Sequence, residues 1–128
     1  LINQSYLSGG QVFLVGDAAG QVKVTTVGGT VTGFRGAQAV VEQILEQDKA
    51  RQTARSLKQE LDLHVWIRKL LERMRLEDYQ QMVELISPEV KKFLAVHDRD
   101  RMRRQFWKLP FLQPRFIPIG FKLLLRSD

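Results

Sequence analysis

Apolar residues recur at helical spacing through most of the second half of the chain. Between residues 50 and 75 they form two adjoining i, i+4 rows on one broad face, which predicts a long helix. Shorter helices are predicted in LEDYQQMVELI, in SPEVKKFLAVH and in DRDRMRRQFWKL. The second of these begins with Ser87 as N-cap and Pro88 at the first helical position. Further prolines then predict an irregular tail before FKLLLRS.

The first half of the chain has a different pattern. The run QVFLVGD is almost fully apolar and ends in Asp17, which predicts a strand. Its continuity indicates a strand buried on both faces, as in an α/β sheet. From Gly28 to Gln47, small and apolar residues recur at helical spacing and predict one helix. The predicted fold class is therefore mainly α with a short N-terminal β element.

Glycines in this last helix are costly. Gly29, Gly33 and Gly36 lie at helical spacing, and each costs a helix about 1 kcal/mol relative to alanine. We expect close packing against a neighbouring backbone or a ligand to offset that cost.

Length and composition exclude several classes of protein. The 128 residues are the usual size of one domain. The absence of cysteine and the two separated histidines predict no disulfide, no thiolate nucleophile and no metal site. The stretch FIPIGFKLLL is too short to span a bilayer, and no signal peptide is recognised. These features favour a cytoplasmic protein. Because the chain begins with Leu1, we expect a piece of a longer protein.

Charge is distributed unevenly along the chain. Residues 1–48 hold two basic and four acidic residues, a net charge of −2, whereas residues 49–128 hold 18 basic and 10 acidic residues, a net charge of +8. The asymmetry predicts two regions with different roles, 1–48 and 49–128. The basic region is suited to nucleic acid, anionic lipid or a negatively charged substrate.

The junction after the first strand has the chemistry of a ligand site. A carboxylate at the C-terminal end of a buried strand, here Asp17, lies where α/β folds bind ligands and suits hydroxyl groups. The start of the helix at Gly28 and Gly29 offers backbone N–H groups and the positive end of the helix dipole. Together they suit a ligand with hydroxyls at one end and negative charge at the other, such as a reduced flavin on its ribityl chain.

The same residues carry a resemblance to a known family. VFLVGDAAGQVKVTTVGGTVTGFRGAQAVVEQIL, from Val12 to Leu45, resembles the second FAD motif of FAD-dependent oxidoreductases of the geranylgeranyl reductase type, within the aromatic-hydroxylase-like flavoproteins. In that motif a strand leads into Gly-Asp-Ala-Ala-Gly, a short loop and a glycine-led helix. The segments LDLHVWIRKLLERM and LEDYQQMVELI are similar to the C-terminal region of the family.

The resemblance implies a function and a set of site residues. It implies the C-terminal portion of an enzyme that reduces isoprenoid double bonds through a flavin hydroquinone, with residues 1–48 from an α/β FAD-binding fold and residues 49–128 as a helical region. Asp17 would bind the ribityl chain, and the Gly28 and Gly29 amides would point at the N1–C2 carbonyl edge of the flavin. No catalytic side chain is identified. The implied cofactor-binding residues are Gly16, Asp17, Ala18, Ala19, Gly20, Gly28 and Gly29.

The chain departs from the family pattern in its loop and in what it lacks. Val24 stands where the family usually has proline. The family usually has three consecutive glycines where this chain has Val27-Gly28-Gly29. The chain has no Gly-x-Gly-x-x-Gly motif for the adenosine half of the cofactor. We therefore expect its partner to be the N-terminal part of the same enzyme. We also expect that the chain alone does not retain FAD.

Other interpretations of single features remain open. The alternative function is a non-enzymatic helical interaction module that binds nucleic acid through its basic surface. Arginines beside Phe106 and Trp107 suit that role, but Asp98 and Asp100 interrupt them, so a solvated helix face is favoured. His64 is predicted as a helix-face histidine in a charged row.

The surface and the strand also predict partners. The tail, with its aromatic residues and basic charge, is suited to contact isoprenoid or anionic lipid at a membrane surface. The alternative, which is favoured, is that the tail packs around a missing domain of the parent protein. If the strand near Val12 has no partner in this chain, it favours self-association. The tail residues expected at such a lipid surface are Phe111, Phe116, Ile117 and Phe121.

Overall fold

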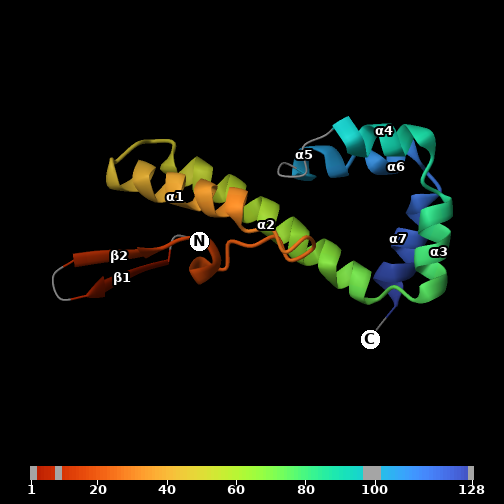
Figure 1. Ribbon diagram of the computed structural model, residues 1–128, viewed down its shortest axis with the longest axis horizontal. Coiled ribbons are helices and arrows are strands. Elements are labelled where there is room, and N and C mark those ends of the chain that lie inside the picture. The colour runs from red at the N-terminus through yellow and green to blue at the C-terminus, as the bar shows by residue number, and fades with distance from the viewer. Residues whose placement is uncertain (1–2, 8–9, 97–101, 127–128) are drawn as a thin grey trace. The chain divides into compact units, whose positions relative to one another are not determined.

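A computed structural model describes residues 3–7, 10–96 and 102–126. These residues are mainly helical, with two strands near the N-terminus (Figure 1). They belong to two compact units, Leu1–Val65 and Trp66–Asp128. The predicted charge boundary at residue 48 lies in the turn before α2, and the division between the units lies inside α2. The elements are β1 (Asn3–Leu7), β2 (Gly10–Leu14), the 3-10 helix η1 (Gly16–Ala19), α1 (Thr30–Ile44), α2 (Ala50–Glu72), α3 (Leu76–Glu84), α4 (Pro88–Val96), α5 (Met102–Phe106), α6 (Leu109–Leu112) and α7 (Phe116–Leu125).

The predicted strand is present, but its surroundings differ from those expected. β2 pairs antiparallel with β1, from Asn3 opposite Leu14 to Leu7 opposite Gly10. The strand near Val12 therefore has a partner in this chain, so the condition under which it favours self-association is not met. The expectation of burial on both faces was wrong, because Val12 and Leu14 are exposed in this two-stranded sheet. A hairpin without a covering layer leaves even an apolar strand open to solvent.

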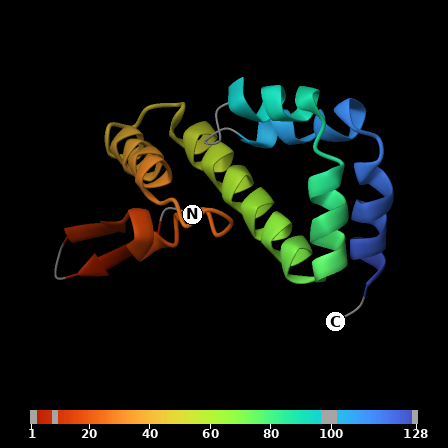
Figure 2. The ribbon, with the colours of Figure 1, turned by 45° about the vertical axis from the view of Figure 1, so that its right-hand side comes forward.

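The core of the first unit lies along α1 and α2. The Glu42 carboxylate accepts a hydrogen bond of 2.6 Å from the Thr53 hydroxyl and thereby joins the two helices. This bond, with smaller contributions from Gln38 and Lys49, holds the pKa of Glu42 below its ordinary value. Figure 2 shows α1 and α2 joined by a short turn. The buried apolar side chains of this unit are Ala39, Val40, Ala50, Leu57, Leu61 and Leu63.

Both predicted helices of this unit are present with small differences at their ends. The helix expected over residues 28–47 begins at Thr30 after Gly29 as N-cap and ends at Ile44. Glu46, with φ of 52°, turns the chain out of the helical conformation. The long helix expected over residues 50–75 ends at Glu72.

The second unit consists of the last turns of α2 and the helices after it. In this unit α3 packs against α7, and α4 packs against α6 (Figures 1 and 2). The Ser87 hydroxyl accepts a hydrogen bond of 3.3 Å from the Val90 amide, which confirms Ser87 as the cap of α4. The prediction of an irregular tail was wrong, because α6 and α7 form there. Pro118 is tolerated because it lies in the first turn of α7, where a backbone N–H has no partner within the helix.

A buried aspartate joins α7 to the start of α3. Asp78 accepts hydrogen bonds from Lys122 Nζ at 2.6 Å and from an Arg126 guanidinium nitrogen at 2.7 Å. It also accepts one of 2.9 Å from the Arg75 amide. The Lys122, Arg75 and Arg126 bonds, in that order of effect, hold the pKa of Asp78 far below its ordinary value. Asp78 is therefore the central ion-pair residue of this unit.

Candidate functional site

The segment expected to contact a flavin forms a tight turn after β2. Gly16 and Gly20 have φ of 63° and 67°, a conformation that side-chain-bearing residues rarely adopt. The Gly20 amide donates to the Asp17 carbonyl at 2.9 Å, and the Gln21 amide donates to the Gly16 carbonyl at 2.9 Å. Ala18 and Ala19 lie on the same turn of η1. The motif Gly-Asp-Ala-Ala-Gly therefore folds as one compact turn with a glycine at each end.

Gln21 fixes this turn to α1. Its side chain is 1% exposed, and its Oε1 accepts a hydrogen bond of 2.8 Å from the Gly16 amide. A Cβ at Gly36 would lie 1.9 Å from Gln21 Oε1, so only glycine leaves room for this side chain. The Thr32 hydroxyl donates to the Gln21 carbonyl.

The predicted site residues from the strand end and from the helix start lie together. A Cβ at Gly29 would lie 2.5 Å from Asp17 Oδ1, so the Asp17 carboxylate lies directly against Gly29. Gly29 is the N-cap of α1, and no side chain caps it. A Cβ at Gly33 would lie 3.3 Å from the Gly16 Cα. These contacts and that of Gly36 confirm that the glycines allow close packing.

Gly28 belongs to a second contact of the same loop. The Lys23 amide donates to the Gly28 carbonyl at 3.1 Å, which closes the loop as an isolated bridge. A Cβ at Gly28 would lie 3.7 Å from Lys23 Nζ. This distance means that the Lys23 ammonium group lies close to the residues that precede α1. Lys23 is also buried. Sequence analysis did not single out Lys23, although it is the one cation between Asp17 and the glycine pair.

Val27 has an unfavourable backbone conformation in this loop. Its φ is 53°, and its side chain is 83% exposed. A β-branched residue in the left-handed region is strained, whereas glycine adopts it freely. The backbone of the loop at Val27 therefore has a conformation for which glycine is suited.

His64 contributes to the packing of the loop, and the charged row predicted for it on α2 is buried at this position, beside Glu60. The His64 side chain is fully buried. Its Nδ1 lies 2.5 Å from the Thr25 hydroxyl oxygen. Its Nε2 lies 3.8 Å from a carboxylate oxygen of Glu60, which is also buried. Among the residues that the structure describes, no group of three or more acidic or histidine side chains is arranged to hold a metal ion. His64 therefore holds the Thr25 loop against α2.

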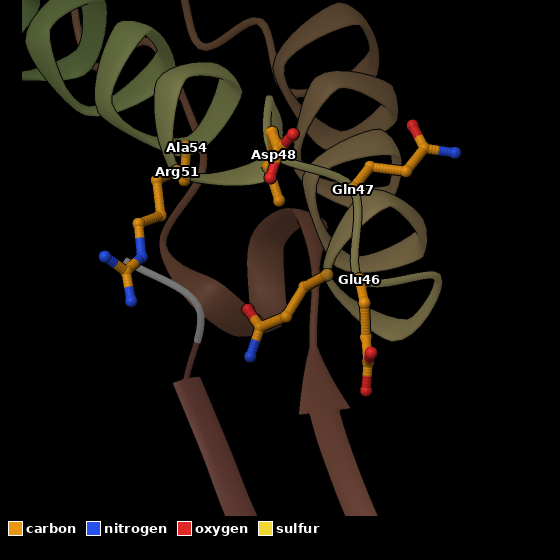
Figure 3. A pocket seen from close by; sticks show the side chains of 7 residues that line it. Glu46, Gln47, Asp48, Arg51 and Ala54 are labelled. Atoms are coloured by element: carbon orange, nitrogen blue, oxygen red, sulfur yellow. The ribbon is translucent and has the colours of Figure 1, made fainter.

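A pocket of about 700 Å³ lies at the turn between α1 and α2 (Figure 3). None of the predicted site residues lines it. In Figure 3 the side chains of Glu46, Gln47 and Arg51 point in different directions rather than toward one common point. The pocket therefore lacks convergent polar groups. Its lining residues are Gln43, Glu46, Gln47, Asp48, Ala50, Arg51 and Ala54.

The two remaining findings concern the proposed nucleic-acid segment and the membrane. The segment proposed for nucleic acid lies partly outside the described residues, since residues 97–101 are not described. Within the described ranges, no helix is long and apolar enough to cross a membrane.

Comparison with known proteins adds no relative. No protein-family model, curated protein or solved structure matches this chain.

Proposed function

We propose that residues 12–45 form the flavin side of an FAD site, in the C-terminal portion of an oxidoreductase of the geranylgeranyl reductase type. One observation carries the proposal: the Asp17 carboxylate lies directly against Gly29 at the uncapped start of α1. This places an acceptor of hydroxyl hydrogen bonds beside a set of backbone N–H donors. A ligand with hydroxyls next to an electron-rich edge fits that pair of groups.

The residues present fit the flavin end of FAD. The Asp17 carboxylate, with two acceptor oxygens, suits the ribityl hydroxyls. The N-terminus of α1 suits the N1–C2 carbonyl edge, because the helix dipole favours negative charge there. The Lys23 ammonium near Gly28 adds positive charge at the same place. Gly29 cannot carry a side chain without displacing Asp17. The other residues of the turn would line the site: Gly16, Ala18, Ala19, Gly20 and Gly28.

The proposed substrate class follows from the resemblance of residues 12–45 to the geranylgeranyl reductase type. When bound, FAD supplies the hydride that reduces an isoprenoid double bond, and the protein supplies orientation and electrostatics. The role of this segment is to hold the flavin and to favour its reduced, negatively charged state. The adenosine half of the cofactor is left to the nucleotide-binding part of the same enzyme, which is the proposed partner. The chain alone therefore binds flavin weakly, through half of the contacts.

The proposal is tested by titrating the ¹⁵N-labelled chain with FMN, which has the isoalloxazine and ribityl parts of FAD, and with AMP, which has neither. We expect FMN to shift the amide resonances of Asp17, Gly20, Gly28 and Gly29, and AMP to leave them in place. Hydrogen bonds to charged groups contribute about 1.5–3 kcal/mol. The variant Asp17→Asn should therefore weaken FMN binding about tenfold or more.

The matched control is Asp62→Asn, which removes an exposed carboxylate of the same unit that pairs with Lys58. This variant should bind FMN like the parent chain. The proposal is wrong if FMN shifts only resonances elsewhere, or if Asp17→Asn and Asp62→Asn have equal effects. Flavin absorbance in the intact native protein that contains this chain is the complementary measurement.

A further inference from the structure

Helix α7 has two apolar faces, and only one of them packs against the second unit. Ile119 and Leu123 are buried. On the other face, apolar side chains follow one another at helical spacing and remain exposed. A helix that is apolar all round is ordinarily covered on every side. The exposed stripe consists of Ile117, Phe121, Leu124 and Leu125.

Two of the residues that precede α7 also carry exposed aromatic side chains. Phe111, on α6, is 87% exposed, and Trp107 is 63% exposed. α6 packs against α7, so Phe111 belongs to the same part of the unit as the stripe. We call these residues, together with the stripe on α7, the apolar surface of the second unit.

The charged residues within the segment that carries the apolar surface are all basic. Residues 102–126 contain six basic residues and no aspartate or glutamate. Lys108 and Arg115 are exposed and flank α6 and the start of α7. Lys122 and Arg126 are partly neutralised by Asp78. Lys108 and Arg115 are therefore available to an outside partner, and each is adjacent in sequence to an aromatic residue, Trp107 and Phe116.

We propose that the apolar surface and its flanking cations dock the second unit onto an anionic lipid surface. With 10 residues, α7 is about half as long as a helix that spans the hydrocarbon core. It suits a position in the interface plane, with the aromatic and aliphatic side chains in the acyl boundary and the cations among headgroups. This inference does not depend on flavin binding.

Two features favour lipid over nucleic acid and over a second copy of the chain as the partner of this surface. The exposed stripe contains Ile117, Leu124 and Leu125, which are aliphatic side chains that do not stack on nucleic-acid bases as aromatic ones do. A second copy of the chain would bring another surface of the same positive sign, which opposes pairing. Anionic headgroups complement the charge, and acyl chains complement the stripe.

The test is co-sedimentation of the full chain with vesicles at low salt. We expect binding to vesicles of phosphatidylcholine with 30% phosphatidylglycerol, and little binding to phosphatidylcholine alone. Each cation near an anionic surface contributes about a factor of five. The double variant Lys108→Gln, Arg115→Gln should therefore weaken binding about 30-fold. The double variant Phe111→Ser, Phe121→Ser should weaken it about tenfold or more by removing inserted apolar area.

Matched controls come from the first unit. Phe34→Ser removes an exposed aromatic side chain, and Arg51→Gln removes an exposed cation. Both should bind vesicles like the parent chain. A second readout is the fluorescence of Trp107 in the Trp66→Phe variant, which should shift to the blue on binding anionic vesicles.

Four outcomes would overturn the proposal. They are equal binding to neutral and anionic vesicles, no binding to either, equal effects of the test and control variants, and tight binding of duplex or single-stranded DNA without vesicle binding. Self-association that Phe121→Ser abolishes, without vesicle binding, would instead assign the surface to a second copy.

Discussion

Val27 is strained in a loop that otherwise fits the proposed site. Its φ of 53° is in the left-handed region, and its exposed side chain makes little packing contact. That conformation costs a residue with a Cβ about 1–2 kcal/mol. Glycine also raises the entropy of the unfolded chain, which offsets part of the gain. Val27→Gly should therefore stabilise the chain by up to about 1 kcal/mol, measured by urea unfolding.

A neighbouring valine provides the control for this prediction. Val24 lies in the same loop and is not in the left-handed region. Val24→Gly should therefore destabilise the chain, through lost packing and added unfolded-state entropy. Equal destabilisation by the two variants would show that Val27 is not strained.

Single residues also show how far sequence analysis could define the site. Asp17 and Gly29 were predicted because a strand-end acid and a helix start are recognisable in a pattern. Lys23 and Gln21 were missed, because their roles depend on where their side chains lie after the loop closes. No periodicity encodes that closure. The contact of His64 with Thr25 was missed for the same reason, since Thr25 is far away in sequence.

The helix α1 depends on its glycines for contact with the turn. In Gly36→Ala the new Cβ would displace Gln21 and break its hydrogen bond to the Gly16 amide. Overpacking and a lost buried hydrogen bond each cost about 1–3 kcal/mol, against about 1 kcal/mol gained in helix propensity. We expect a net loss of about 1–5 kcal/mol in the free energy of unfolding.

A double-mutant cycle isolates this contact. In a Gln21→Ala background the obstacle is gone, so Gly36→Ala should become neutral or stabilising. Gly120→Ala on α7, where a Cβ would meet nothing within 4 Å, should stabilise the chain by about 1 kcal/mol. The same cost of Gly36→Ala in both backgrounds would disprove the proposed role of Gln21.

Periodicity predicted helices α1 to α5, and it missed β1, α6 and the start of α7. α1 and α2 follow many turns of repeated apolar positions, so their existence was clear from the sequence. α6 and the start of α7 contain prolines, which were taken as interruptions. At Pro118 the proline lies in a first helical turn, where it removes no hydrogen bond. The hairpin was missed because NQSYL lacks an apolar run that marks a strand.

At the scale of the whole molecule, the ion pairs of Asp78 should make the second unit sensitive to acid. The folded-state pKa of Asp78 lies far below its ordinary value of 3.8. The stabilisation is therefore fully present above that ordinary value and is lost as the pH falls through the folded-state value. Asp78→Asn should lower the Tm at pH 7 and flatten the fall of Tm below about pH 4.

Tryptophan fluorescence reports the acid unfolding of the second unit, because Trp66 and Trp107 both lie in that unit. The control is Glu77→Gln, which removes an exposed carboxylate from the same first turn of α3. It should leave the acid dependence unchanged. If Asp78→Asn keeps the steep acid dependence of the parent chain, another carboxylate is responsible.

The contact of Gln21 with the turn affects the rates at which a ligand would bind and dissociate. Because this side chain bonds the Gly16 amide and packs against Gly36 of α1, the turn is held against the helix before anything binds. Little conformational entropy is then lost on association, and such preorganisation favours fast capture without a slow rearrangement. A flavin should therefore arrive and leave quickly at this segment. In the proposed function, its residence time would lengthen only when the proposed nucleotide-binding partner adds contacts.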